Sequence, residues 1–240
     1  MRRYANLVFF AGMIIMNYLA NALPLGGKTT GELSDAYPNL FVPAGITFSI
    51  WGIIYLLLAG FGVAQFSQRG APLAESLGWL FAVSCLLNGL WIVAWHYEKV
   101  PLSLLVMAGL LLTLILINAR LEDQPLGLTK AAFGIYLGWI SIATIANVTA
   151  LLVRLHWDGF GISPEIWTIV MIVAGAAIVS AAILKLANPF LGLAVVWAFA
   201  GIILKRSQDS PSIVAAAAAG ILAVAAVTIR AFLKEWAGPA

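Results

Sequence analysis

The sequence predicts an all-α fold, a polytopic bundle of about eight transmembrane helices. Of the 240 residues, 62% are hydrophobic and only 10% are charged, and the mean hydropathy is +1.00. A soluble domain has about 25% charged and about 45–50% apolar residues, so this chain lacks the polar surface that a soluble fold of its size needs. Its apolar runs are continuous, whereas the strands of a transmembrane barrel alternate apolar and polar residues. The composition therefore excludes a soluble enzyme, a disordered segment and a transmembrane barrel.

Eight apolar segments are candidates for the spans, because a helix needs about 20 mostly apolar residues to cross a bilayer. The predicted spans are residues 5–23, 44–66, 76–96, 101–119, 130–153, 165–186, 189–204 and 211–233. The seventh is the shortest, and it begins directly after Asn188-Pro189. The first follows Arg2 and Arg3, as the apolar region of a signal peptide would, but it is longer than such a region. We therefore interpret it as a retained helix.

The one long connection is residues 24–43, which are rich in Pro, Gly, Ser and Asp. A polar loop of this length in a tight bundle is either a lid over a functional site or a plain exposed connector. With eight spans, eight of the 13 Lys and Arg residues fall on the side of both termini and five on the other. The positive-inside rule then places both termini in the cytoplasm and the long loop outside.

Charged side chains are missing from the interiors of the predicted spans. Ion-coupled transporters and proton pumps keep an ionisable group inside the membrane, and a cyclase that protonates an alkene needs a buried acid. The sequence thus argues against an ion-coupled transporter, a proton pump and a cyclase of this kind. The single cysteine, Cys85, cannot form an intrachain disulfide, and the two histidines, His96 and His156, give no metal-site spacing. We expect no metal and no resident cofactor, and the net charge of +3 does not indicate a nucleic-acid partner.

Three predicted helices carry aromatic rings and polar groups at helical spacing on one face. The faces are Phe48, Trp51 and Tyr55 in the second span, Asn88, Trp91 and Trp95 in the third, and Tyr136, Trp139, Ala143 and Asn147 in the fifth. Uncharged faces of this kind suit a large, flat, mostly apolar ligand. The alternative is helix packing, with the two asparagines as interhelical hydrogen-bonding groups.

Other tryptophans lie near the ends of spans, where they are interpreted as interfacial anchors. These are Trp79, Trp95, Trp157 and Trp236. His96, at the end of the third span, is interpreted as an interfacial residue and not as a ligand. The pair Gly134-x-x-x-Gly138 permits a close helix approach and makes a homodimer a candidate assembly.

Three motifs follow one another on the second, third and fifth predicted helices. They are Pro43 followed by Phe48-x-x-Trp51-x-x-x-Tyr55, then Leu87-Asn88-x-x-Trp91, then Tyr136-x-x-Trp139-x-x-x-Ala143-x-x-x-Asn147. In these motifs the sequence resembles the tryptophan-rich sensory protein family, also called the translocator protein or peripheral benzodiazepine receptor family (TspO/MBR). The resemblance covers about residues 1–155. It implies a five-helix bundle with a pocket capped by the first loop, which binds porphyrins, sterols or synthetic isoquinoline and benzodiazepine-type ligands.

The resemblance and the residues together predict two parts: a ligand-binding bundle over residues 1–155 and a three-helix extension over residues 156–240. The candidate ligand-binding residues are Trp51, Tyr55, Asn88, Trp91, Tyr136, Trp139, Ala143 and Asn147. The predicted function is a receptor or sensor in a bacterial inner membrane for a porphyrin or a similar flat, apolar ligand. A facilitative carrier of that ligand, a membrane enzyme acting on an isoprenoid or pigment, and a structural partner with an Ala-rich last helix are the alternatives. The expected partners are the bilayer and an apolar small molecule.

Overall fold

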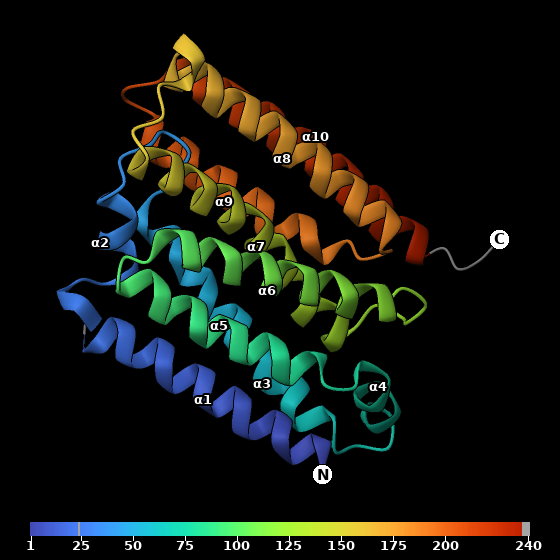
Figure 1. Ribbon diagram of the computed structural model, residues 1–240. Coiled ribbons are helices and arrows are strands. Elements are labelled where there is room, and N and C mark those ends of the chain that lie inside the picture. The colour runs from blue at the N-terminus through green and yellow to red at the C-terminus, as the bar shows by residue number, and fades with distance from the viewer. Residues whose placement is uncertain (24, 237–240) are drawn as a thin grey trace.

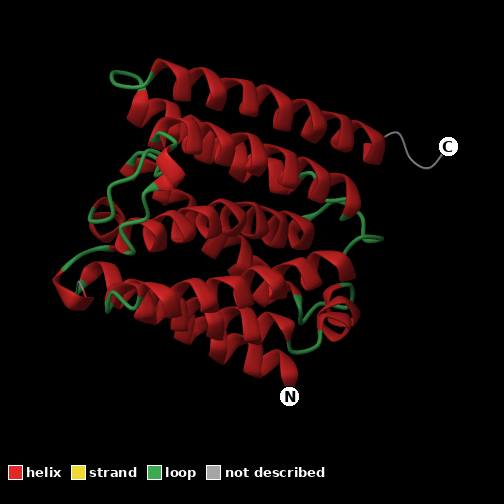
Figure 2. Ribbon diagram, turned by 45° about the horizontal axis from the view of Figure 1, so that its top comes forward, coloured by secondary structure: helices red, strands yellow, loops and turns green. Residues whose placement is uncertain are grey.

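The computed structural model describes residues 1–23 and 25–236, and within these residues the chain forms helices and no strand (Figures 1 and 2). Eight long helices lie in the described part: α1 (Arg2–Ala22), α3 (Ile50–Ala64), α5 (Leu80–His96), α6 (Val100–Arg120), α7 (Leu128–Arg154), α8 (Pro164–Lys185), α9 (Phe190–Arg206) and α10 (Pro211–Trp236). Shorter helices are η1 (Leu25–Gly27), α2 (Thr30–Asp35), η2 (Gly45–Ser49), α4 (Gly70–Leu77) and η3 (Gly159–Gly161). The prediction of an all-helical membrane bundle is confirmed.

Six of the described helices are long and apolar enough to cross a bilayer: α1, α3 together with η2, α6, α7, α8 and α10. The pair α4 and α5, bent by 63°, is a seventh candidate. The bend lies at Gly78, which follows the last residue of α4 and has a φ of 61°. The predicted third span, residues 76–96, therefore contains the end of α4 as well as α5. With 17 residues, α9 is shorter than the usual length of a span. Each of the eight predicted segments thus corresponds to an apolar helix, and six of these helices have the length of a span.

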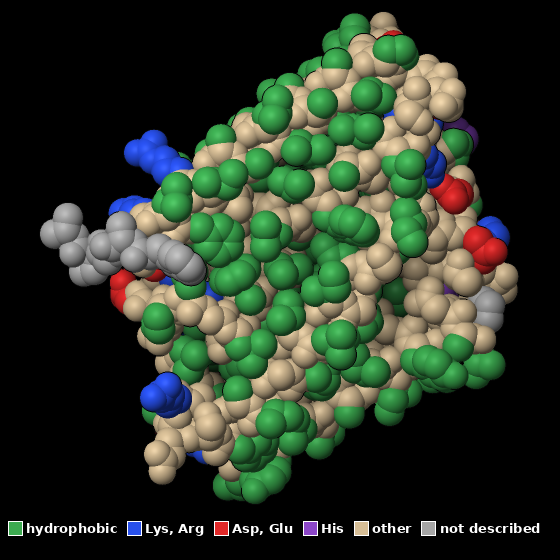
Figure 3. Space-filling view, turned by 180° about the vertical axis from the view of Figure 1, so that it is seen from behind, with side chains coloured by type: hydrophobic (Ala, Val, Ile, Leu, Met, Phe, Trp, Pro, Cys, Tyr) green, Lys and Arg blue, Asp and Glu red, His purple; other side chains and the backbone are tan. Residues whose placement is uncertain are grey.

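Charged side chains are concentrated at the two ends of the bundle, and the face seen in Figure 3 is apolar between them. The start of α1 and the end of α10 lie at the same end, and α2 lies at the opposite one (Figure 1). Charged ends and an apolar middle are the arrangement that a membrane-spanning helical bundle requires. It leaves apolar side chains on the middle of the outer surface, where lipid can cover them.

Helices α1, α3, α5, α6 and α7 form one group, in which α5 packs between α1 and α6, and α7 packs against α3 and α6. The C-terminal helices join this group chiefly through α9, which packs on α7 and is itself covered by α8 and α10. At the contact, Gly134 faces Asn188 and Phe190, and Gly138 faces Leu191. The predicted close approach at Gly134-x-x-x-Gly138 is therefore made inside the chain, against α9, and this pair gives no support to a homodimer.

A buried polar cluster joins α6 and α7 to the turn before α9. Lys130, the third residue of α7, donates from Nζ to the carbonyl oxygens of Glu122 and Ala187, each at 2.9 Å. The Asn188 amide donates to Asn118 Oδ1 at 2.8 Å and to the Lys130 carbonyl at 3.0 Å. These bonds satisfy polar groups that would otherwise be buried without partners.

We expect Asn188→Ala to lower the free energy of unfolding by about 1–3 kcal/mol, because it leaves buried acceptors on Asn118 and Lys130 without their donor. The measurement is the midpoint of thermal denaturation in detergent. Gln124→Ala, at an exposed position at the same end of the bundle, is the control and should leave the midpoint unchanged. Equal midpoints for the two variants would contradict the structural role of the cluster.

Candidate functional site

Residues 25–43, which we call the lid, form a folded segment that closes one end of the bundle. Within it, α2 starts at a capping box in which the Thr29 amide donates to Glu32 Oε2 at 2.7 Å and the Glu32 amide donates to Thr29 Oγ1 at 3.3 Å. The hydrogen bond from the Thr29 amide, followed by that from its hydroxyl, lowers the pKa of the Glu32 carboxyl. Leu33 and Phe41 are buried. The lid is therefore packed on the helices and is not a plain exposed connector.

Beneath the lid lies a cavity that we call the tryptophan pocket. Its lining consists of Thr30, Ser34, Asn39, Val42, Pro43, Phe48, Trp51, Trp91, Trp95, Trp139, Ile142, Ala143, Ala146, Asn147 and Ala150. Its free volume is about 50 Å³, which accommodates a few water molecules, since each needs about 10–15 Å³. Drug-sized ligands occupy pockets of about 300–1,000 Å³. In this conformation the indole rings themselves fill the space, so a large ligand requires side chains or the lid to move.

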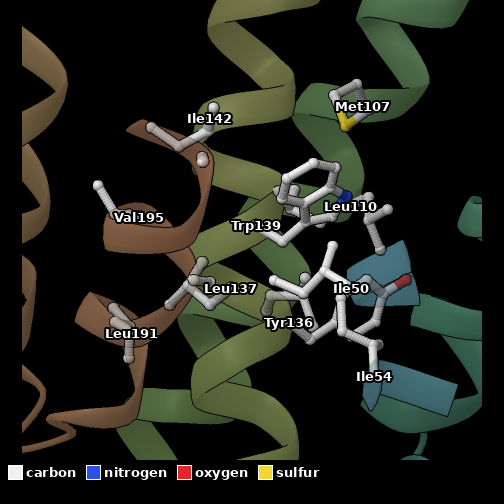
Figure 4. Packing of buried hydrophobic residues seen from close by; sticks show 14 of the residues in the cluster. Ile50, Ile54, Met107, Leu110, Tyr136, Leu137, Trp139, Ile142, Leu191 and Val195 are labelled. Atoms are coloured by element: carbon white, nitrogen blue, oxygen red, sulfur yellow. The ribbon is translucent and has the colours of Figure 1, made fainter. Parts of the chain in front are cut away.

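Three helices bring their tryptophans together in this pocket. The Trp51 ring from α3 stacks near the Trp91 ring from α5, with centroids 6.3 Å apart and planes at 28°. It meets the edge of Trp139 from α7 at 6.3 Å and 83°. In Figure 4, Tyr136 lies beside Ile50 and Ile54 of α3, and the Trp139 ring lies beside Leu110 of α6. On the other face of α7, Leu137 points toward Leu191 of α9. The helical spacing of the aromatic residues thus does place rings on converging faces.

Of the eight predicted site residues, five line the pocket: Trp51, Trp91, Trp139, Ala143 and Asn147. Asn88 and Tyr136 lie outside the lining and bond to each other, with the Asn88 amide donating to Tyr136 Oη at 2.8 Å. Asn17 of α1 donates to Asn88 Oδ1 at 2.8 Å. This Asn17–Asn88–Tyr136 chain ties α1, α5 and α7 together and leaves these groups already paired. Asn17 did not figure in the sequence prediction, although an amide inside an apolar span is itself a signal for interhelical bonding.

Tyr55 lies in the wall of a second cavity, of about 350 Å³, between α1 and α3. This cavity shares Thr30, Phe48 and Trp51 with the tryptophan pocket. The Tyr55 ring stacks near Trp51, with centroids 5.5 Å apart. Side chains of α3, η2 and the lid therefore separate the two cavities.

Asn147 holds the wall of the pocket in place through its amide. Its Oδ1 accepts from Ser103 Oγ at 3.0 Å and from Trp91 Nε1 at 3.4 Å, and its Nδ2 donates to the Ala143 carbonyl at 3.2 Å. Ser103 lies on α6 and was missed by the sequence prediction because a single serine in an apolar run carries no specific signal. The Asn147 bonds orient the indole of Trp91 toward α7.

The interpretation of Trp95 as an interfacial anchor is wrong. Its side chain is only 5% exposed, lines the pocket, and stacks near Trp91 with centroids 6.3 Å apart and planes at 19°. The buried Trp95 Nε1 has no hydrogen-bond partner among the described residues. The physical reason for the error is the lid, which covers the end of α5 that hydropathy assigns to the membrane surface. An unpaired buried donor is costly.

His96, interpreted as interfacial, is also buried by the lid. Its Nδ1 lies 2.9 Å from the Leu25 carbonyl and its Nε2 lies 3.0 Å from Thr30 Oγ1. Because a carbonyl can only accept, Nδ1 is the donor, and in the neutral ring Nε2 accepts from the Thr30 hydroxyl. His96 thus fastens the first half of the lid to α5.

The other predicted anchors differ in their surroundings. Trp79 is 55% exposed, as an anchor should be. Trp157 is half-buried and packs on Trp167 and Phe160, and the side chain of Trp236 lies outside the described residues.

Every described residue that lines the tryptophan pocket is uncharged, and the described part of the chain holds no group of three or more His, Cys, Asp or Glu placed to bind a metal. The geometry defines a class: a helical membrane protein with a small, aromatic, uncharged pocket beneath a folded loop. A family model described as TSPO-like protein matches residues 3–230, and the chain belongs to this family. The match includes α8, α9 and most of α10. No curated protein and no solved structure matches the chain.

Proposed function

We propose that this protein is a membrane receptor or sensor that binds a flat, largely apolar ligand in the tryptophan pocket, with a tetrapyrrole as the expected class. The observation that supports this most is the convergence of Trp51, Trp91, Trp95 and Trp139 on one cavity beneath the lid. Indole faces interact with flat rings by offset or edge-on stacking. The uncharged lining suits the apolar body of such a ligand, and Trp95, which lines the pocket, has an Nε1 donor that is not used by the described residues.

Binding on this proposal exchanges indole–indole contacts for indole–ligand contacts. The free volume of about 50 Å³ is far below the size of a tetrapyrrole, so entry of the ligand must be coupled to movement of the lid or of the rings. A protein that changes conformation when it binds is suited to sensing, because the differential affinity for the open and closed forms shifts their populations.

The test is a titration of the purified protein with protoporphyrin, a sterol and a carotenoid, followed by quenching of tryptophan fluorescence. We expect saturable quenching by the porphyrin. A titration in which none of the three probes gives saturation would contradict the proposal.

A facilitative carrier of the same ligand is the second candidate. It is favoured by the cavity of about 350 Å³ between α1 and α3, which adjoins the tryptophan pocket at Trp51 and Phe48. Such a cavity offers a passage between the pocket and the lipid side of the bundle. Porphyrin flux into liposomes that contain the protein separates the carrier from the receptor, since the receptor alone gives no flux.

We further propose that both termini lie in the cytoplasm of a bacterial cell and that the lid lies outside the inner membrane. Eight of the 13 Lys and Arg residues lie on the side of the termini. In a Cys85→Ala background, a cysteine replacing exposed Gln68 and one replacing exposed Tyr97 should be labelled from opposite sides by an impermeant maleimide. We expect Tyr97→Cys to react in intact cells and Gln68→Cys to react only after lysis. The reverse result would invert the orientation.

A further inference from the structure

The second half of the lid is fastened by α9, a helix that follows it by about 150 residues in the chain. Arg206, at the end of α9, donates from Nη2 to the Asn39 carbonyl at 2.8 Å and from Nε to the Leu40 carbonyl at 3.2 Å. Its Nη1 pairs with Asp209 Oδ2 at 3.1 Å, which orients the guanidinium. In Figure 1 the blue segment after α2 lies beside the orange end of α9.

Further contacts continue along α9 toward the middle of the bundle. Lys205 Nζ pairs with Asp35 Oδ1 at 2.7 Å. The Ala44 amide donates to the Gly201 carbonyl at 3.0 Å, and Trp197 Nε1 donates to the Thr47 carbonyl at 2.8 Å. A side chain at position 201 would collide with Thr47 and come within 2.9 Å of Pro43 Cβ. Glycine at this position therefore allows α9 to lie directly against the end of the lid.

Residues 39–42 form a single turn that is held by its own internal hydrogen bonds. Asn39 Oδ1 accepts from the amides of Phe41 and Val42, both at 3.1 Å. The Asn39 and Leu40 carbonyls, which Arg206 holds, thus belong to the same turn as Val42, which lines the tryptophan pocket. The turn thus connects Arg206 to the roof of the pocket.

The same turn separates the tryptophan pocket from a larger outer cavity of about 450 Å³. Ser34, Asn39 and Val42 line both spaces. Lys205 and Arg206 line the outer cavity from the side of α9. If the turn moves away, the two spaces become continuous, and their combined volume falls in the range that binds drug-sized ligands.

We propose that Arg206, with the Asn39 and Leu40 carbonyls, is a latch that holds the lid closed against α9, and that ligands reach the tryptophan pocket from the outer cavity when this latch opens. The inference rests on the proposed function for its ligand, but the latch itself can be measured without one. It makes α9 part of the binding unit, so residues 1–155 alone lack the residue that controls access.

The test uses two single variants of the full chain. Arg206→Gln removes the guanidinium that bonds the lid, and Trp197→Phe keeps an aromatic ring but removes the donor to the Thr47 carbonyl. Lys99→Gln, which removes an exposed positive charge at the same end of the bundle, is the control. The first measurement is hydrogen exchange of the Phe41, Val42 and Ala44 amides without ligand. We expect exchange roughly tenfold faster in Arg206→Gln, as the loss of hydrogen bonds from a charged group implies, a smaller increase in Trp197→Phe, and no change in Lys99→Gln.

The second measurement is the association rate of protoporphyrin in a stopped-flow experiment, and we expect it to rise in the same order. Unchanged exchange in both Arg206→Gln and Trp197→Phe would overturn the latch. Faster exchange with an unchanged association rate would overturn the entry route. If the wild-type protein binds no porphyrin, the proposed function fails, and the exchange rates alone decide whether the latch exists.

Discussion

Trp139→Ala is expected to weaken porphyrin binding at least about tenfold, which corresponds to roughly 1.4 kcal/mol. Trp139 is 3% exposed, lines the tryptophan pocket, and contacts Phe48 and Trp51 edge-on at 5.8 and 6.3 Å. Its removal takes away a stacking surface worth about 0.5–1.5 kcal/mol beyond its buried area, together with apolar contact worth about 25 cal/mol per Å². Trp139→Phe keeps a ring in place and should weaken binding only a few-fold.

Binding is best followed by the absorbance of the porphyrin, because each tryptophan variant lacks one of the fluorophores. The matched control is Trp79→Ala, since Trp79 is 55% exposed and does not line the pocket. The thermal midpoint of each variant must be measured in parallel, because deleting a buried tryptophan also destabilises the fold. Equal losses of affinity at Trp139 and Trp79, or none at either, would mean that Trp139 only packs the core.

The number and position of the apolar helices could be predicted from the sequence, because the thickness of the bilayer sets the length of an apolar segment. The start of the third segment could not. The apolar character runs on through Leu77 and Trp79, whereas the helix breaks at Gly78, where φ is 61°. Hydropathy reports where a chain meets lipid, and it carries no information on a backbone angle.

Within the candidate site, helical spacing predicted which tryptophans share a face, and the structure brings Trp51, Trp91 and Trp139 to one cavity. Trp95 and His96 were misplaced because their burial depends on the lid, a segment more than 50 residues away in the chain. When another segment of the fold covers a helix end, tryptophan and histidine there are buried in the protein and do not lie at the membrane–water interface.

The contribution of α9 to the site was also not visible in the sequence. In the sequence, Lys205 and Arg206 indicate only the orientation of the chain in the membrane, as two of the five positive charges on the side of the lid. Their bonds to Asp35, Asn39 and Leu40 link positions about 170 residues apart. A boundary drawn at residue 155 for the binding unit therefore separates the lid from the helix that holds it.

Gly138→Ala is expected to destabilise the protein by about 1–3 kcal/mol or more, as overpacking of a tight interface does. A methyl group at this position would fall on the Leu191 carbonyl oxygen of α9 and lie 3.1 Å from Ala194 Cβ. A backbone carbonyl cannot rotate away as a flexible side chain can, so α9 as a whole would have to move from α7. Because α9 also holds the lid, the same variant should speed hydrogen exchange at Phe41 and Val42.

The control is Gly52→Ala on α3, where a methyl group meets nothing within 4 Å and alanine favours the helix. The thermal midpoint in detergent should fall for Gly138→Ala and stay level or rise for Gly52→Ala. Equal midpoints would show that α7 and α9 do not pack at this distance, and the α9 contribution to the lid would lose its support.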